Sequence, residues 1–248
     1  MRICFFSDIH GNGSAFHAFV KWMEIEQPDK IIFGGDFFGY YYDALGILHE
    51  MQELQYICIR GNHDQMMLDC KEDPSILHQI HDLNRLEGRY GSSYQQAFQQ
   101  ISKEDLDFLH GLPEKLEMTV DGIKIGFFHG SPRDPLLDRI YPDTVIEDIS
   151  AFKPYDYVFC GHTHHKLVKQ IGHTWLINPG SAGQQRDGKG TSYVIFDTQK
   201  RIFRLQSFAY DCKVVEQQIE EYEKNSPDMA RKLKEVLYRR TIEKRPVI

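Results

Sequence analysis

The sequence predicts an α/β fold, because one pattern recurs along the chain. A short apolar run ends abruptly in a cluster of Gly, Asp, Asn and His, and a segment with helical spacing usually follows. The pattern occurs at least five times, in RICFFSDIHG, KIIFGGDFFG, YICIRGNHD, KIGFFHGSP and DYVFCGHTHH. Apolar residues at consecutive positions are typical of strands buried on both faces, and ligand sites in such sheets gather beyond the strand ends. We therefore expect five polar clusters to meet at one edge of the fold.

Helical spacing follows the first two strands and dominates the middle of the chain. Apolar residues predict a first helix that starts near Ser14 and is closed by Pro28, and a second over about residues 43–54. Residues 65–111 have a helical pattern for an unusually long stretch, in which a capping box over residues 102–105 begins another helix. We interpret this stretch as a helical excursion near the site.

The second half of the chain reads as strands and ends in helices. A strand that begins at Leu116 turns at Asp121-Gly122 into a hairpin. Further strands are expected over residues 175–178, 192–197 and 202–208. Two amphipathic helices follow, the second of which is opened by Ser226-Pro227. We therefore expect a main domain over residues 1–210 and a C-terminal helical extension over residues 211–248 that packs on it.

Composition limits the classes of partner. The chain has 248 residues, of which 41% are hydrophobic and 26% charged, as in an ordinary globular protein with one substantial core. Lys and Arg total 29 against 36 Asp and Glu, so the formal net charge is −7, and no basic stripe predicts an extended nucleic-acid partner. An acidic chain can still bind a phosphorylated substrate, because bound cations reverse the field locally.

The lack of a recognisable targeting signal and the spacing of the cysteines predict a cytoplasmic protein. The N-terminal apolar run is too short for a signal peptide, and no later apolar stretch approaches a membrane span. The five cysteines form an odd set without Cys-x-x-Cys spacing, which indicates neither a disulfide framework nor a thiolate zinc site. Cys4, Cys58 and Cys160 lie in strand-like runs, so we expect them to be buried and reduced.

The polar clusters contain side chains that suit a two-metal site. Two close metal ions need a bridging anion, neutral ligands for each shell, and open positions for water and substrate. On an extended chain the Asp-x-His and His-x-His pairs would each project both side chains to one side, so that each pair grips one site. The clusters offer only oxygen and imidazole donors: Asp8, His10, Asp36, Asn62, His63, Asp64, His129, His162 and His164.

These clusters resemble the five-block signature of calcineurin-like metallophosphoesterases. The blocks are Asp8-x-His10, Gly35-Asp36, Gly61-Asn-His-Asp64, His129 and Gly161-His-Thr-His164. The residues of each block are common in turns and helix caps, but all five blocks in this order are specific to the family. The resemblance implies a four-layer α/β/β/α sandwich, in which two mixed β-sheets pack face to face with helices outside and a two-metal site lies at the strand ends.

The resemblance also implies a role for each signature residue. The first divalent ion would be held by Asp8, His10, Asp36 and His164. The second would be held by Asp36, Asn62, His129 and His162, with Asp36 as the bridge. Manganese is the expected ion, and iron or zinc would also suit an N/O site. A hydroxide made available by the two cations would attack phosphorus in line. His63 would protonate the departing alkoxide, and Asp64 would orient and charge its imidazole.

Further motifs resemble a bacterial and archaeal subgroup related to diadenosine tetraphosphatases and small phosphodiesterases. These are Gly35-Asp-Phe-Phe-Gly-Tyr40, His129-Gly-Ser-Pro132, Asn178-Pro-Gly-Ser181 and Gln185-Arg-Asp-Gly188. Serine/threonine protein phosphatases continue the second block into Asp-Arg-Gly, whereas this chain has no arginine there. Substrate phosphate or a base could contact Tyr40, Arg133 and Arg186, although arginines in loops are as often simply solvated.

We therefore predict a metal-dependent phosphoesterase that hydrolyses phosphodiesters or nucleoside polyphosphates. Its partner would be a phosphorylated small molecule or nucleotide, with no extended nucleic acid and no membrane. Two alternatives stay open: a phosphoprotein or phosphomonoester phosphatase, and a non-catalytic binding scaffold of the same fold. The charged C-terminal helices are either a packed extension or the surface of a homo-oligomer.

Overall fold

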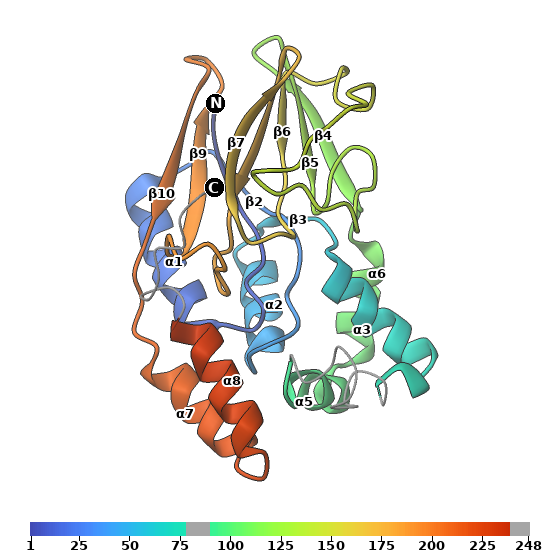
Figure 1. Cartoon of the computed structure of the whole chain (residues 1–248), viewed down its shortest axis with the longest axis vertical. Helices are drawn as coiled ribbons and strands as arrows, with labels where there is room; N and C mark the ends of the chain where they lie inside the picture. Colours follow the sequence, from blue (N-terminus) through green and yellow to red (C-terminus); the bar gives the residue numbers. More distant parts are fainter. Residues whose placement is uncertain (78–89, 239–248) are drawn as a thin grey trace.

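The computed structural model describes residues 1–77 and 90–238, and contains two five-stranded β-sheets (Figure 1). The first sheet has the strand order β10-β9-β1-β2-β3. Its strands are β1 (Arg2–Phe6), β2 (Lys30–Phe33), β3 (Ile57–Cys58), β9 (Ser192–Asp197) and β10 (Ile202–Ser207). The pairs β1–β2 and β2–β3 are parallel, whereas β9 is antiparallel to β1 and to β10. The sheet is therefore mixed.

The second sheet is also mixed and has the order β4-β5-β6-β8-β7. Its strands are β4 (Lys115–Val120), β5 (Ile123–Phe128), β6 (Tyr157–Phe159), β7 (Lys166–Ile171) and β8 (Thr174–Pro179). The central pairs β5–β6 and β6–β8 are parallel, and the outer pairs are antiparallel. The predicted hairpin is confirmed as β4–β5. Strand β7, which was not among the expected strands, pairs with β8 across a turn at Gly172.

The two sheets pack face to face through a layer of aromatic and branched side chains. The ring of Phe5 on β1 lies 5.7 Å from that of Phe127 on β5 and 5.8 Å from that of Phe159 on β6. Ile3 and Ile125 belong to the same buried cluster. Side chains from alternate positions of both sheets thus bury one another, which confirms the sandwich that the resemblance implied.

Helices α1 (Gly13–Glu26) and α2 (Ala44–Glu53) pack against the first sheet, whereas α7 (Lys213–Tyr222) and α8 (Pro227–Tyr238) lie below α1, beyond the strands (Figure 1). The sequence predicted all four helices. Their apolar faces share one core cluster with the sheet, in which Phe19 of α1 stacks on Phe6 of β1 at 4.0 Å. The outer face of the second sheet is instead covered by an irregular segment, residues 129–156, through Ile140 and Phe152.

The expected helical excursion contains three described helices. They are α3 (Asn62–Glu72), α5 (Ser93–Gln100) and α6 (Lys103–Gly111). The predicted capping box at the start of α6 is confirmed, since the Ser102 hydroxyl and the Asp105 carboxylate each accept a hydrogen bond from the other's backbone N–H. Residues 78–89 of the excursion lie outside the described residues. Because α3 begins at Asn62, the Asn-His-Asp motif forms the first turn of a helix.

Candidate metal centre

The predicted ligands lie just beyond the ends of strands from both sheets. In such sheets, loops that leave neighbouring strand ends converge, which allows distant parts of the sequence to share one site. The residues follow β1 (Asp8, His10), β2 (Asp36), β3 (Asn62, His63, Asp64), β5 (His129) and β6 (His162, His164).

The backbone of the paired ligands is left-handed and not extended. The φ angles are 60° at Asp8, 50° at His10, 66° at His162 and 59° at His164. The prediction that each pair projects to one side of an extended chain is therefore wrong. Non-glycine residues at positive φ cost on the order of 1–3 kcal/mol each, and such strain gathers at functional sites. Backbone hydrogen bonds stabilise this conformation, since Asp8 N–H donates to the Gly35 carbonyl at 3.0 Å.

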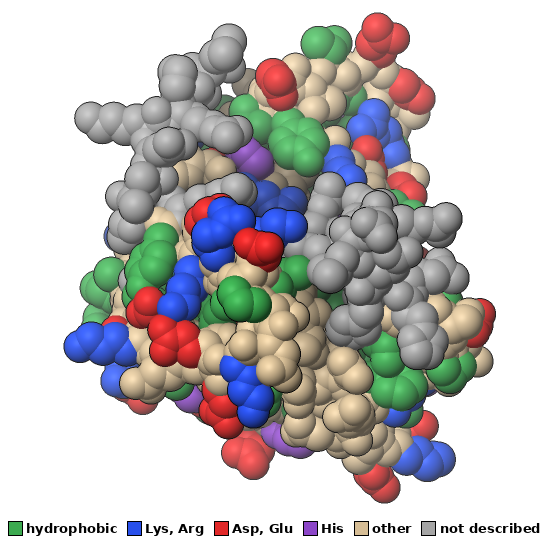
Figure 2. Space-filling model, turned by 60° about the horizontal axis from the view of Figure 1, so that its bottom comes forward, with side chains coloured by type: hydrophobic (Ala, Val, Ile, Leu, Met, Phe, Trp, Pro, Cys, Tyr) green, Lys and Arg blue, Asp and Glu red, His purple; other side chains and the backbone are tan. Residues whose placement is uncertain are grey.

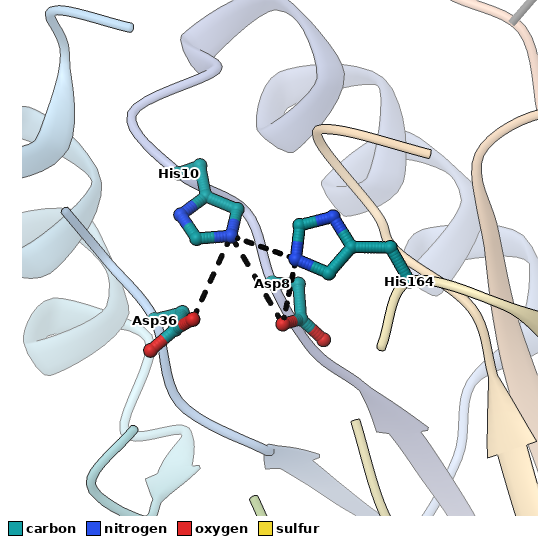
Figure 3. Close-up of side chains that lie close together, drawn as sticks. All are labelled: Asp8, His10, Asp36 and His164. Carbon is teal, nitrogen blue, oxygen red and sulfur yellow. Dashed lines mark hydrogen bonds and ion pairs between the residues drawn. The ribbon is translucent and has the colours of Figure 1, made fainter. Parts of the chain in front are cut away.

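The first ligand group consists of Asp8, His10, Asp36 and His164, which are buried and bring one ligand atom each within 4.8 Å of the others (Figure 3). The Nε2 atoms of His10 and His164 are 3.0 Å apart. Asp8 Oδ1 lies 3.2 Å from His164 Nε2, and Asp36 Oδ2 lies 3.6 Å from His10 Nε2. Figure 3 shows the four side chains converging on one point from three different loops.

The second ligand group consists of Asp36, His129 and His162, with Asn62 beside it. His129 Nε2 lies 3.3 Å from Asp36 Oδ2, 3.1 Å from His162 Nδ1 and 2.9 Å from Asn62 Oδ1. The pair His162-x-His164 is thus divided between the two groups. Asp36 belongs to both, so its carboxylate is the geometric bridge between them.

Backbone carbonyls fix three of the imidazoles. The Nδ1 atoms of His10 and His129 lie 2.6 Å from Phe38 O and 2.8 Å from Gly34 O, and His164 Nδ1 lies close to Gln184 O. A carbonyl can only accept, so these Nδ1 atoms carry hydrogen. In a neutral imidazole the lone pair is then on Nε2, which is the nitrogen that faces the group. The Nε2 atoms of His10 and His164 are 3.0 Å apart, so their two lone pairs would repel each other unless a cation lies between them.

The electrostatics of the site also fit a cation. Asp36 Oδ2 is buried and has no hydrogen-bond partner among the described residues. Burial alone would raise the pKa of Asp36, but the imidazoles of His129 and His63 hold it well below its ordinary value. Burial lowers the pKa of His10 to about 4 and that of His162 to about 3. Against the effect of burial, the Asp36 carboxylate raises the pKa of His129 to about 9, so this imidazole is charged and pairs with Asp36 at 3.3 Å in the metal-free site. A buried anion that lies between such an imidazole and the neutral ones of His10 and His162 is a donor set that a divalent metal ion satisfies when it replaces the proton.

Asp64 and His63 do not form the predicted pair. Both oxygens of the Asp64 carboxylate accept hydrogen bonds from backbone N–H groups, of Asp36 at 2.9 Å, Phe37 at 2.7 Å and Gly61 at 2.8 Å. The expectation that Asp64 orients the His63 imidazole is therefore wrong, because this carboxylate caps α3 and holds the loop after β2. His63 Nδ1 is instead 2.5 Å from the hydroxyl of Tyr94 on α5, a partner that the sequence analysis missed.

The three residues predicted to contact substrate lie in different surroundings. Tyr40 packs edge-on against His10, with ring centroids 4.9 Å apart, and its hydroxyl accepts a 2.6 Å hydrogen bond from Arg186. These two residues border the first ligand group. Arg133 makes a two-pronged ion pair with Asp138 on the surface, which occupies its guanidinium.

Arg139 is a further basic residue at the centre. Its Nε donates a 2.8 Å hydrogen bond to Nε2 of His162, which places an exposed guanidinium beside the second ligand group. On the face drawn in Figure 2, Lys and Arg side chains lie among Asp and Glu side chains. The basic groups at the centre itself are the guanidinium groups of Arg139 and Arg186, which favour a negative ligand there despite the acidic bulk composition.

The described residues contain no helix of the length and apolarity that a bilayer span requires. All five cysteines are buried and free, which confirms the expectation for Cys4, Cys58 and Cys160.

Comparison with known proteins agrees with this geometry. A metallophosphoesterase from Sphaerobacter thermophilus has a similar structure, with a TM-score of 0.69 and 26% identity over 94% of this chain and 99% of that one. A hypothetical protein from Pyrococcus horikoshii shares the fold, with a TM-score of 0.77 and 19% identity over 94% and 97% of the two chains. An uncharacterized protein of Methanocaldococcus jannaschii is 30% identical over 229 residues, which cover 85% of this chain and 88% of that protein. The model of the calcineurin-like phosphoesterase superfamily domain matches residues 1–201, so the chain belongs to this superfamily.

Proposed function

We propose that this protein hydrolyses phosphodiesters or nucleoside polyphosphates with the help of two divalent metal ions. The observation that carries the proposal is the Asp36 carboxylate, which is buried, shared by both ligand groups and faced at one oxygen only by imidazole nitrogens, without a hydrogen bond among the described residues. A buried carboxylate is costly unless cations satisfy its charge. Membership of the superfamily makes a metallophosphoesterase the natural chemistry for such a site.

The residues on either side of Asp36 would each hold one ion. The first ion would be bound by Asp8, His10, Asp36 and His164, and the second by Asp36, Asn62, His129 and His162. Manganese is our choice, although an N/O donor set also accepts iron or zinc. When bound, such ions supply Lewis acidity, which makes hydroxide available near neutral pH and neutralises charge on the phosphoryl oxygens.

The chain's own residues would bind the substrate and stabilise the leaving group. His63 is our candidate for the residue that forms a hydrogen bond with the leaving oxygen of the substrate. Arg186 and Tyr40, beside the first ligand group, are candidates for holding a non-reacting phosphate or a base, because a guanidinium suits phosphate and an aromatic ring suits stacking. Diesters and polyphosphates are favoured over phosphoproteins because the loop after Asp36 continues with Phe37 and Phe38, without the arginine that phosphoprotein phosphatases carry.

Turnover by the purified, metal-loaded protein tests the proposal. Bis-p-nitrophenyl phosphate, p-nitrophenyl phosphate and dinucleoside polyphosphates would be offered with added manganese. We expect metal-dependent hydrolysis of the diester or the dinucleotide at a higher kcat/KM than of the monoester. A preference for the monoester would support the alternative of a phosphomonoester or phosphoprotein phosphatase. If none of the three substrates is hydrolysed, the proposal is rejected.

Metal analysis tests the second alternative, a binding scaffold without activity. We expect close to two ions per chain, because both ligand groups are complete. A stoichiometry near zero in protein purified with manganese would favour the scaffold. The free cysteines fit our further proposal that the protein works in a reducing, cytoplasmic compartment.

A further inference from the structure

The imidazole of His63 is enclosed by aromatic rings and held at one nitrogen. Its ring centroid lies 4.7 Å from that of His10, 5.0 Å from that of Tyr90 and 5.9 Å from that of Tyr94, and its side chain is nearly inaccessible. The Tyr94 hydroxyl lies 2.5 Å from His63 Nδ1. Only one ring nitrogen, Nε2, is then left for a substrate.

The direction of this hydrogen bond follows from the other contact of the hydroxyl. Tyr94 Oη is 3.4 Å from the His63 carbonyl, which is long for an O–H···O bond. A buried hydroxyl hydrogen seldom goes without a good acceptor, so it points to Nδ1. Burial raises the pKa of Tyr94 well above its ordinary value, and the hydroxyl therefore keeps its hydrogen. With the Nδ1 lone pair occupied, the ring hydrogen of His63 is on Nε2.

The helix that carries Tyr94 is anchored by a residue beyond the part of the chain that the family model matches. Ser92 is the N-cap of α5, and both its backbone N–H and its hydroxyl donate to Glu223 Oε1, at 2.6 Å and 2.8 Å. The Tyr42 hydroxyl donates to the same oxygen at 2.8 Å. Glu223 is buried and caps the C-terminal end of α7, whereas the family model ends at residue 201. A carboxylate at a helix N-terminus is also favoured by the helix dipole.

Close packing reinforces this anchor. Gly91 has a φ of 57°, and a Cβ there would lie 2.5 Å from Glu223 Oε1 and 2.8 Å from a methyl group of Leu233 on α8. Only glycine allows so close an approach in this conformation. Leu233 belongs to the core cluster that also contains Tyr94. The α7–α8 hairpin thus holds the start of α5 through both polar and apolar contacts.

We propose that Tyr94 is the positioning residue of His63, and that the C-terminal hairpin holds Tyr94 in place through Glu223. This inference rests on the proposed function and deepens it, because it assigns the work expected of Asp64 to a tyrosine and gives the extension a role in the site. Deprotonation of a neutral imidazole at Nε2 would leave an unfavourable imidazolate, so His63 donates a hydrogen bond to the leaving oxygen. The bond from hydroxide oxygen to phosphorus forms, the bond to the leaving oxygen breaks, and water then supplies the proton to that oxygen.

A series of aryl phosphodiesters with leaving groups of increasing pKa tests the role of Tyr94. We expect Tyr94→Phe to slow the poorest leaving groups about 10–100-fold, as the loss of a partner that orients a functional histidine does, and to change the best ones little. In a His63→Ala background the same substitution should have no further effect, because the two residues act as one unit. Equal slowing of every substrate, or an undiminished effect without His63, would overturn the assignment.

Glu223→Gln tests the hairpin, with Glu220→Gln as its matched control. Glu220 lies on the same helix but is exposed and pairs with Lys234. We expect Glu223→Gln to steepen the dependence on leaving-group pKa as Tyr94→Phe does, with a smaller slowing of about 3–10-fold, and Glu220→Gln to match the wild type. If Glu223→Gln lowered the melting temperature but left the dependence of the rate on leaving-group pKa unchanged, Glu223 would have only a structural role. This part of the proposal would then be wrong.

Wild-type turnover and metal content distinguish a failure of the proposed function from a failure of the roles given to Tyr94 and Glu223. A wild-type protein without metal-dependent turnover contradicts the proposed function itself. If the wild type is active and both variants keep its metal content, a flat leaving-group response contradicts only the inference. The ¹⁵N shifts of the His63 ring, which distinguish an acceptor Nδ1 from a protonated one, supply a readout that does not depend on activity. We expect Tyr94→Phe to change them.

Discussion

The two ligand groups differ in how far they are closed off. In the first group no residue exceeds 1% exposure, and Tyr40 and Arg186 border it. The second group is more open, since His162 is 6% exposed, Asn62 is half-buried and the exposed Arg139 contacts His162. A closed group favours permanent retention of an ion, whereas an open one leaves room for exchange and for substrate. The groups share Asp36, so the difference is one of access and not of donor type.

Asp36→Asn should have the largest effect, because it removes the only carboxylate common to both groups. An amide cannot bridge two cations as an anion does, so we expect loss of one or both ions and a fall in kcat of at least about 10³-fold. Metal analysis and diesterase assays would measure both quantities. Asn in place of Asp is nearly isosteric, so the fold should persist. Full metal content with full activity would show that the bridge lies elsewhere.

Acid should destabilise the metal-free protein through the closed group. Burial lowers the pKa of His10 to about 4, whereas the unfolded chain protonates it near the ordinary value of 6.5. Between these values the unfolded state binds more protons, so the free energy of unfolding falls as pH drops from 6.5 toward 4. At pH 5 this residue alone accounts for about 2 kcal/mol of the loss, at 1.36 kcal/mol per pKa unit.

Urea unfolding of chelated protein at pH 7 and pH 5 would measure this loss. The variant His10→Gln should lose about 2 kcal/mol less than the wild type over this range. The exposed His17 on α1 provides the control, and His17→Gln should behave as the wild type does. If His10→Gln showed the same acid sensitivity as the wild type, His10 would not be neutral in the metal-free fold.

The sequence alone predicted those parts of the site that depend on local patterns of residues. Consecutive apolar residues before each polar cluster predicted β1, β2, β5 and β6, and the order of the blocks predicted which side chains would converge. The left-handed φ angles at Asp8 and His162 were not predictable in this way, because period-two alternation assumes an extended chain. The tertiary loop contacts decide that conformation.

The missed residues have no local signal. Tyr94 fits the apolar stripe of a helix with Phe98 and Ile101, and nothing in that spacing indicates that its hydroxyl meets His63. Arg139 lies in an irregular segment without a periodic pattern. Asp64 misled because adjacency in sequence suggested a pair, whereas the third position of a helix turns its carboxylate back to the N-terminal backbone amides. The position of Asp64 as the third residue of a helix, from which a carboxylate accepts the N–H of the N-cap residue, would have indicated this contact.

The difference in access also predicts stepwise removal of metal. With chelator in excess, the ion of the open second group should leave about tenfold faster than that of the closed first group, because solvent access controls exchange. Release followed by a metal-sensitive dye would then show two phases. His162→Ala should remove the fast phase and keep the slow one. A single phase in the wild type would mean that the two groups do not differ in access.

The smallest expected effect is a difference in KM between substitutions of Arg139 and Arg133, two arginines of the same irregular segment. Arg139→Ala should raise KM for a diester up to about tenfold, which corresponds to one charge-assisted hydrogen bond of about 1.5 kcal/mol. Arg133→Ala should leave KM within about twofold, because an exposed ion pair such as that of Arg133 with Asp138 contributes little and its guanidinium is already occupied. Steady-state kinetics at several salt concentrations would distinguish a specific contact from a general field, since only the latter is strongly screened. Equal effects of the two substitutions would mean that the open group attracts substrate by overall charge and that Arg139 has no special place in it.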